Sequence, residues 1–155
     1  MTLQWLADLP HATLLRHWDT AYLLVNAAHI CAIGVLFGTI AALDLRLLGA
    51  ARALPLSSAA PYLARMAASG LLLAVLTGFW LFSVQPAQYL GNTAFLAKLA
   101  LIALGTLNAL WLHAGRSWRR LLADAPVPPV ARLHAALSIL LWLAAIVAGR
   151  WIGFL

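Results

Sequence analysis

Four long apolar runs occupy most of this chain, at residues 20–43, 62–84, 94–112 and 133–153. Each run has about the 20 residues that an α-helix needs to cross ~30 Å of hydrocarbon. Inside a bilayer every backbone polar group must find its partner within the protein, which a helix achieves by itself. The runs therefore predict an integral membrane protein with four helical spans.

Composition agrees with this prediction, because hydrophobic residues make up 65% of the chain and charged residues only 9%. Soluble domains carry about 25% charged residues. The net charge of +6 comes from nine Arg and one Lys against four Asp. Most of these Arg lie in two short loops, which is the topology signal of a membrane protein, so we expect no nucleic-acid partner. Cys31 is the single cysteine, which excludes an intrachain disulfide.

The loops predicted at residues 45–61 and 113–132 lie on one side of the membrane and carry most of the positive charge. Their side holds Arg46, Arg52, Arg65, Arg116, Arg119, Arg120 and Arg132, and the other side holds Arg16, Lys98 and Arg150. Because positively charged loops stay in the cytoplasm, we expect a bacterial inner-membrane protein with both termini in the periplasm.

Short connections between the spans predict an all-α fold, an integral membrane up-and-down four-helix bundle, with residues 1–155 forming a single domain. The first 18 residues mix Leu and Trp with charged residues and predict a short helix lying in the interface. They lack the basic segment of a cleavable signal, so the first span is expected to stay in the protein. The GxxxG pairs Gly34–Gly38 and Gly149–Gly153 predict close helix packing, and they allow a homo-oligomer.

Polar residues inside the spans fall on predicted inward faces. At 100° per residue, Asn26, His29 and Asp44 share one arc of the first span, and Arg46 follows at its cytoplasmic end. Lys98 and His113 share an arc of the third span, and His134, Ser138 and Trp142 share an arc of the fourth. Ionisable residues in a membrane span are functional by default, so these are the candidate site residues.

Histidines on three inward faces favour a b-type heme, because a porphyrin inside a bundle is held by imidazoles from its helices. His113 and His134 lie near the same depth and could share one iron. His29 lies 17 residues before Arg46, which is ~25 Å along a helix, so it belongs to a separate outer site with His17 or His11, or to none. Attachment would be non-covalent, since no CxxCH motif is present.

Each of these residues also has a structural interpretation. His113 and His134 could face headgroups at their helix ends, and His29 could be a neutral imidazole bonded to Asn26 or to a backbone carbonyl. Asp44 is expected to pair with a cation at its level, which is Arg46, Arg65 or Arg132. Lys98 and Arg150 share the outer level, where they could attract a lipid phosphate, a quinone oxygen or heme propionates, or could snorkel to the surface.

Five segments resemble a family of small uncharacterised bacterial four-span inner-membrane proteins. They are Leu36–Gly49 (LFGTIAALDLRLLG) after His29, Leu76–Ser83 (LTGFWLFS), Gly91–Leu99 (GNTAFLAKL), Leu107–His113 (LNALWLH) and Ser138–Phe154 (SILLWLAAIVAGRWIGF). More distantly, the layout is similar to copper-resistance D-type proteins and to b-type cytochromes built on four helices. The resemblance implies that His29, Asp44, Arg46, Lys98, His113 and Arg150 recur in the family, whereas His134 lies outside its pattern.

The leading functional expectation is a membrane redox subunit that carries heme b and meets a periplasmic redox partner or a quinone in the lipid bilayer. A transporter for a metal ion or small solute, using His29 and Asp44, is the alternative, and a non-catalytic scaffold is a third. Copper(I) is disfavoured, because Cys31 and, beyond Met1, Met66 are the only sulfur ligands. No phosphate loop or nucleophile elbow is present, which argues against nucleotide or hydrolase chemistry.

Overall fold

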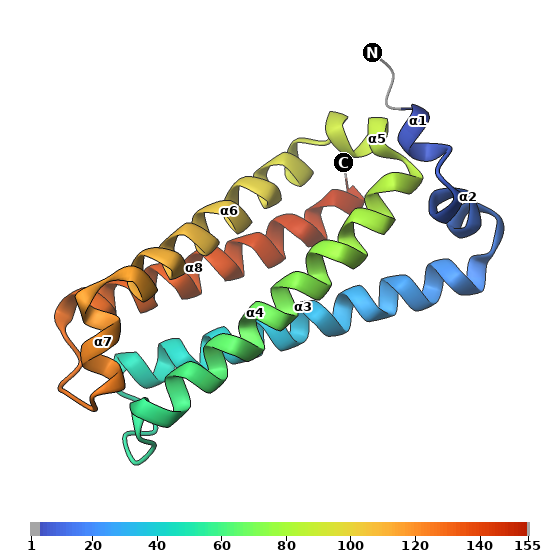
Figure 1. The fold of residues 1–155 in the computed structure, drawn as a ribbon. Helices are drawn as coiled ribbons and strands as arrows, with labels where there is room; N and C mark the ends of the chain where they lie inside the picture. The colour runs from blue at the N-terminus through green and yellow to red at the C-terminus, as the bar shows by residue number, and fades with distance from the viewer. Residues whose placement is uncertain (1–3, 155) are drawn as a thin grey trace.

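The computed structural model describes residues 4–154, which are helical apart from short connections (Figure 1). The helices are α1 (Gln4–Ala7), α2 (Pro10–His17), α3 (Asp19–Leu48), α4 (Leu56–Val84), α5 (Pro86–Gly91), α6 (Thr93–Ala114), α7 (Arg116–Leu122) and α8 (Pro129–Trp151), followed by the 3-10 turn η1 (Ile152–Phe154). Four of them, α3, α4, α6 and α8 (with η1), are long and apolar enough to cross a membrane. The predicted all-α four-helix bundle is confirmed.

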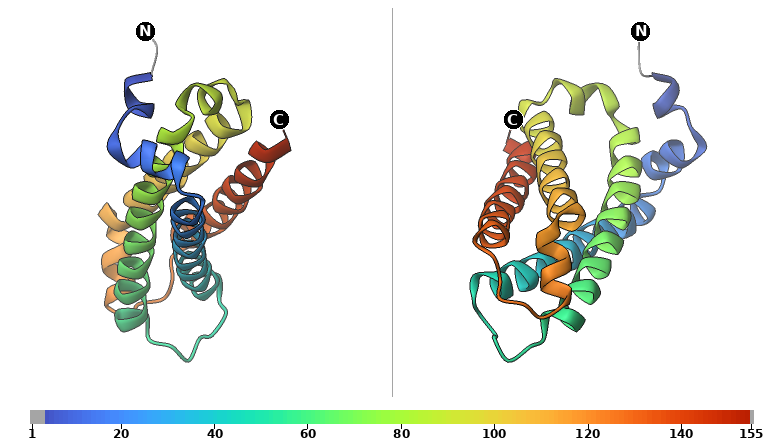
Figure 2. Two further views of the ribbon diagram at one scale, coloured as in Figure 1. Left: turned by 90° about the vertical axis from the view of Figure 1, so that its right-hand side faces the viewer. Right: turned by 60° about the vertical axis from the view of Figure 1, so that its left-hand side comes forward.

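The four long helices form two antiparallel hairpins, α3 with α4 and α6 with α8 (Figures 1 and 2). The hairpins meet where α3 packs against α8, whereas the backbones of the consecutive spans α4 and α6 make no close contact. Their one ring contact lies near the termini, where Phe82 of α4 stacks on Phe95 of α6 with centroids 5.5 Å apart. The six-residue helix α5 lies between α4 and α6 in the chain and holds them apart. The backbones of α4 and α6 therefore leave an opening between them away from these two rings.

Glycines set the closest approach within each hairpin. A Cβ atom added at Gly70 of α4 would lie 2.6 Å from the backbone nitrogen of Leu36 of α3, so only glycine fits there. In the second hairpin the indole of Trp142 on α8 lies against Gly105 of α6, where an added Cβ would be 3.0 Å from the ring. By contrast, Gly34 and Gly38 face open space, so this predicted GxxxG pair does not pack within the chain.

Helix ends follow local capping chemistry. Gly49 ends α3 with a φ of +115°, a left-handed conformation that glycine adopts without strain. The helix that contains the predicted second span, residues 62–84, begins earlier, at Leu56, and includes Pro61. Proline is tolerated there because its missing N–H removes a single hydrogen bond near the helix end. The Asp124 carboxylate accepts a hydrogen bond of 2.9 Å from the Ser57 backbone N–H, which caps α4 from the far side of the bundle.

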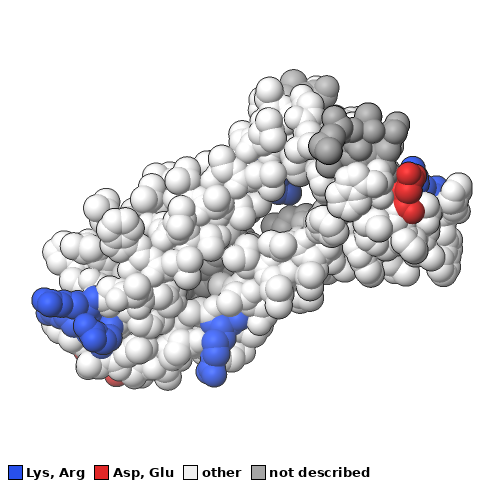
Figure 3. All heavy atoms as spheres, turned by 45° about the horizontal axis from the view of Figure 1, so that its top comes forward, with Lys and Arg blue, Asp and Glu red and all other residues white. Residues whose placement is uncertain are grey.

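The end of the bundle with the α3–α4 loop and α7, called the loop end here, is closed by a compact apolar cluster. Its buried members are Leu43, Leu47, Leu56, Ala60, Leu112, Leu121, Ala131 and Ala135. Lys and Arg side chains gather on the surface at this end (Figure 3). Both termini lie at the opposite end (Figure 1), so the predicted segregation of charge is present in the fold.

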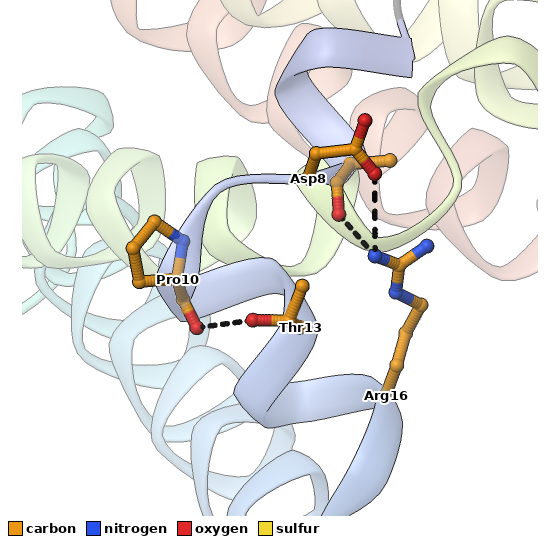
Figure 4. A network of polar contacts seen from close by, with 5 residues as sticks. Asp8, Pro10, Thr13 and Arg16 are labelled. Atoms are coloured by element: carbon orange, nitrogen blue, oxygen red, sulfur yellow. Dashed lines mark hydrogen bonds and ion pairs between the residues drawn. The ribbon is translucent and has the colours of Figure 1, made fainter.

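The N-terminal segment forms two short helices, α1 and α2, which pack mainly against α4, with further contacts to α3 and α5. Leu6, Ala12 and Leu15 are its buried side chains. Arg16 ties the two helices together, since it lies 3.9 Å from the Asp8 carboxylate and donates a hydrogen bond to the carbonyl of Ala7 (Figure 4). The Thr13 hydroxyl donates to the Pro10 carbonyl at 2.9 Å. The predicted helix is thus present in two pieces, and Pro10 begins the second.

Candidate functional site

A cavity of about 380 Å³ lies between the two hairpins in the half of the bundle nearer the loop end. We call it the interhairpin cavity. Figure 3 shows the molecule hollowed between the hairpins. Its walls are mainly alanine and leucine side chains, and α3, α4, α6 and α8 all contribute to them. Its polar lining residues are Thr39, Asp44, Arg65, Thr106, Asn108, His113, His134 and Ser138, and Trp142 also lines it.

His134 of α8 and Asn108 of α6 form a reciprocal pair of hydrogen bonds. The Asn108 side-chain nitrogen donates to the backbone carbonyl of His134 at 3.0 Å, because a carbonyl oxygen can only accept. The Asn108 Oδ1 therefore faces His134 Nδ1 at 2.7 Å and accepts a hydrogen bond from its N–H. This network assigns the proton of a neutral imidazole to Nδ1 and leaves a lone pair on Nε2.

His113 of α6 is fixed in the same tautomer by its own helix. Its Nδ1 lies 2.6 Å from the carbonyl oxygen of Ala109, which can only accept, so Nδ1 carries the proton. One ring face packs on Trp118 of α7, with the ring centroids 3.9 Å apart. His113 and His134 thus line one cavity, and both belong to the α6–α8 hairpin.

Asp44 and Trp142 are buried in the cavity wall with unsatisfied polar atoms. Asp44 of α3 is 5% exposed and Trp142 of α8 is 4% exposed. Neither Asp44 Oδ2 nor Trp142 Nε1 has a hydrogen-bond partner among the described residues. The Ser138 side chain lies beside the Asp44 carboxyl group. Buried polar atoms are nearly always satisfied in folded proteins, so two orphans in one cavity indicate a missing partner.

The prediction that a cation pairs with Asp44 is wrong, because this carboxyl group forms no salt bridge with any described residue. Arg46 turns away and donates to the carbonyls of Leu54, at 2.9 Å, and Arg52, at 3.2 Å. Arg65 donates to its own helix at the Pro61 carbonyl. The backbone carbonyls of the α3–α4 loop attract the Arg46 guanidinium group, because a loop peptide group needs a donor that the helix interior already supplies.

His29 lies in the α3–α4 interface, in the half of the bundle nearer the termini. Its Nδ1 is 2.8 Å from the Thr77 Oγ1, which itself donates to the Leu73 carbonyl at 2.6 Å, so Nδ1–H donates to Thr77. The ring lies against Gly78, where an added Cβ would be 3.0 Å from Cε1. The inward placement of His29 is confirmed, whereas Asn26 was wrongly placed inward and is exposed. The helix turns its Ala32 and Leu36 side toward α4, which moves Asn26 to the outer surface.

Lys98 and Arg150 do not converge on one point. The Lys98 side chain runs along α8 against Gly149, and its ammonium group is close enough to act electrostatically on His29. Arg150 is exposed and lies over the Phe154 ring, 5.2 Å from its centroid. The interior of the bundle near the two termini is therefore lined by one lysine and one histidine rather than by two cations.

The sequence analysis missed the parts played by Asn108 and Thr77, and it placed Trp142 inward without a role for its buried indole nitrogen. Asn108 carried a usable signal, because an amide in the middle of an apolar span needs a partner. Thr77 carried none, since threonine commonly bonds its own helix in a span. Comparison with protein family models, curated proteins and solved structures returns no match.

Proposed function

We propose that this protein is a membrane redox subunit of the bacterial inner membrane, and that the interhairpin cavity is its working site. The observation that supports the proposal is that several ionisable side chains line this mainly apolar cavity together. A buried carboxyl with an unpartnered oxygen lies in the same cavity as two imidazoles whose Nε2 lone pairs are free of hydrogen bonds among the described residues. A carboxyl group and an imidazole can each accept a proton from a bound molecule.

Access to this set favours a lipid-soluble carrier. The side of the bundle between α4 and α6 is open, and in a bilayer it faces hydrocarbon. Organic electron carriers that dissolve in the membrane exchange protons together with electrons, so they need proton acceptors where they bind. A carboxyl and two neutral imidazoles beside a lateral opening meet that need. The electrons would pass to a second redox partner on the periplasmic side.

Heme b is the cofactor expected from the sequence, and the histidines fit it in chemistry but not in placement. Iron-bound histidines use one ring nitrogen and donate the other N–H to a carbonyl or a similar acceptor, and His29, His113 and His134 each have that arrangement. However, His113 and His134 stand on the same hairpin, and the bond to Asn108 holds His134 against α6. A porphyrin between them would have to separate α6 from α8, so we derive no electron-transfer step through heme.

A small-solute transporter is the second candidate, and one observation favours it. His29 and Lys98 line the interior toward the termini, and Asp44 and His134 line it toward the loop end, which gives polar groups at two depths. A metal ion is a poor cargo for this path, because the described residues contain no cluster of three His, Cys, Asp or Glu side chains. A scaffold role has the exposed Gly34–Gly38 surface in its favour.

The proposal is tested on protein purified with its native lipids in mild detergent. Absorption spectra are recorded before and after chemical reduction, and extracted cofactors are identified by mass. We expect a redox-active carrier at up to one per chain, either a quinone or a heme with a reducible Soret band. A preparation that holds no such carrier, and takes none up from added lipid extract, would contradict the redox proposal and leave transport as the better account.

A further inference from the structure

We propose that the interhairpin cavity binds the ring of a quinol, with one hydroxyl group between Asp44 and Trp142. This inference rests on the redox function proposed above and names the carrier. It starts from the two unsatisfied atoms in the cavity wall. Asp44 Oδ2 is an acceptor without a donor, and Trp142 Nε1 is a donor without an acceptor, and both side chains are more than nine-tenths buried.

The two orphan atoms belong to side chains that line the same cavity. Ser138 and Trp142 stand four residues apart on α8 and so occupy the same face one turn apart. The Asp44 carboxyl lies beside Ser138. A single hydroxyl group in this corner can donate its O–H to Asp44 and accept the N–H of Trp142. Water could do the same, but the surrounding wall is alanine and leucine, which favours an apolar body attached to that hydroxyl.

A second hydroxyl distinguishes a quinol from other lipid-soluble alcohols. His113 and His134 line the same cavity, and each presents an Nε2 lone pair with no donor among the described residues. A quinol carries two O–H groups on opposite edges of a flat ring, and the cavity offers acceptors at the carboxyl and at the imidazoles. A sterol or a long-chain alcohol has one hydroxyl group and would leave the imidazoles unserved.

The route into the cavity fits the hydrophobic tail of such a molecule. Residues of α4 and α6 form two of the cavity walls, and the backbones of these helices make no close contact beside the cavity. In a bilayer this opening faces lipid chains, so an isoprenoid tail can remain in the hydrocarbon while the ring enters. A soluble ligand would have no comparable path, because the loop end is closed by the cluster around Leu47 and Leu121.

The test is a binding titration of the full-length protein in detergent with a short-chain ubiquinol kept reduced. Its dimethyl ether, which has the same ring without O–H donors, is the matched ligand. We expect the ether to bind at least tenfold more weakly, because it cannot donate the hydrogen bonds of the two O–H groups. Equal binding of quinol and ether would overturn the proposal without any variant having to fold.

Variants locate the hydroxyl group. Asp44→Asn should weaken quinol binding about tenfold, and Trp142→Phe, which removes only the indole N–H donor from an aromatic side chain, about fivefold. Trp111→Phe is the control, since Trp111 is 76% exposed on α6 and outside the cavity. Quinol binding that Asp44→Asn and Trp142→Phe leave unchanged would overturn this site but not the redox function. Finding a reducible heme but no quinol binding would likewise overturn the quinol site and leave the redox function standing. Absence of every carrier would contradict both proposals. Displacement of quinol by an equal amount of phospholipid would identify a lipid site instead.

Discussion

At the scale of single residues, the hairpin contacts depend on two glycines that no sequence motif marked. Gly70 admits the backbone of α3 at Leu36, and Gly105 admits the indole of Trp142. The GxxxG pair at Gly34 and Gly38, which the sequence favoured, faces open space instead. Close approach is decided by which helix lies opposite a glycine, and spacing along the chain carries no information about that.

Gly70→Ala should destabilise the bundle, because the new methyl group would lie 2.6 Å from a backbone atom of α3 that has no freedom to move away. Overpacking of this kind costs about 1–3 kcal/mol. Gly34→Ala is the matched control on the partner helix, with nothing within 4 Å of the added atom. Unfolding of both variants in mixed micelles by denaturant measures the difference. Equal stability of the two would show that α3 and α4 are not packed this closely.

The histidines give a second prediction at this scale, on the heme-to-protein ratio of any preparation that shows a reducible Soret band. His113 and His134 belong to one hairpin and leave Nε2 without a hydrogen bond among the described residues, so either could bind iron, but a porphyrin between them would have to separate α6 from α8. We therefore expect either His113→Ala or His134→Ala, but not both, to abolish heme binding, while His29→Ala retains that heme. Loss in both single variants would support the shared iron that the sequence suggested.

At the scale of elements, α4 is capped by a residue from the opposite hairpin. Asp124, with a φ of +51° after α7, accepts hydrogen bonds from Ser57 at the start of α4. The hydrogen bonds from the Ser57 side chain and backbone, with a smaller effect of Arg46, lower the pKa of Asp124 below its usual value of 3.8. Because the pKa is lowered on folding, the stabilisation is complete well above pH 3.8 and is lost as the pH falls through the lowered pKa.

Asp124→Ala should consequently lower the melting temperature at pH 7 and should have little effect at a pH below the lowered pKa, where the wild-type carboxyl is protonated. At each pH, the melting curves of the variant and of the wild type are measured in detergent, with helix content as the monitored signal. Asp8→Ala is a control carboxyl at the other end of the molecule, where it meets only Arg16. A difference between Asp124→Ala and wild type that persists unchanged into acid would contradict the cap.

Sequence and structure agree best where one physical rule decides the outcome. Hydrophobic length fixed the four spans to within a few residues at most ends, and helical periodicity placed His29, Lys98 and His134 toward the interior. The inward prediction for Asn26 was wrong, because the face of α3 that contacts α4 is shifted from the centre of the polar arc. The isolation of Asp44 from every arginine could not be foreseen, since it depends on which loop carbonyls capture Arg46.

At the scale of the whole molecule, charge segregation predicts the orientation in the membrane. The basic side chains gather at the loop end and both termini lie at the other end (Figures 1 and 3). A reporter that works only in the periplasm, fused at the C-terminus, should therefore be active, because positive loops stay in the cytoplasm. A cytoplasmic reporter at the same position should be silent. Activity of the cytoplasmic reporter alone would reverse the orientation.

The openness of the bundle between α4 and α6 is the feature on which the functional account depends. Two hairpins joined mainly through α3 and α8 leave a cavity between them, and we propose that lipid-soluble molecules enter it from the side. A substitution that fills the cavity with a larger apolar side chain, and leaves its polar residues unchanged, distinguishes carrier binding inside the cavity from carrier binding elsewhere on the surface. Ala109 of α6 lines the cavity, and Ala103 of the same helix is exposed on the lipid side.

The most direct test of the account is the amount of redox-active carrier that co-purifies with Ala109→Phe, compared with Ala103→Phe and with wild type. The phenyl ring at residue 109 takes up space inside the cavity, whereas at residue 103 it adds only to the lipid-facing surface. The account predicts that Ala103→Phe retains the wild-type amount of carrier and that Ala109→Phe, at equal helix content, loses most of it. Full retention by Ala109→Phe would contradict the claim that the interhairpin cavity is the working site.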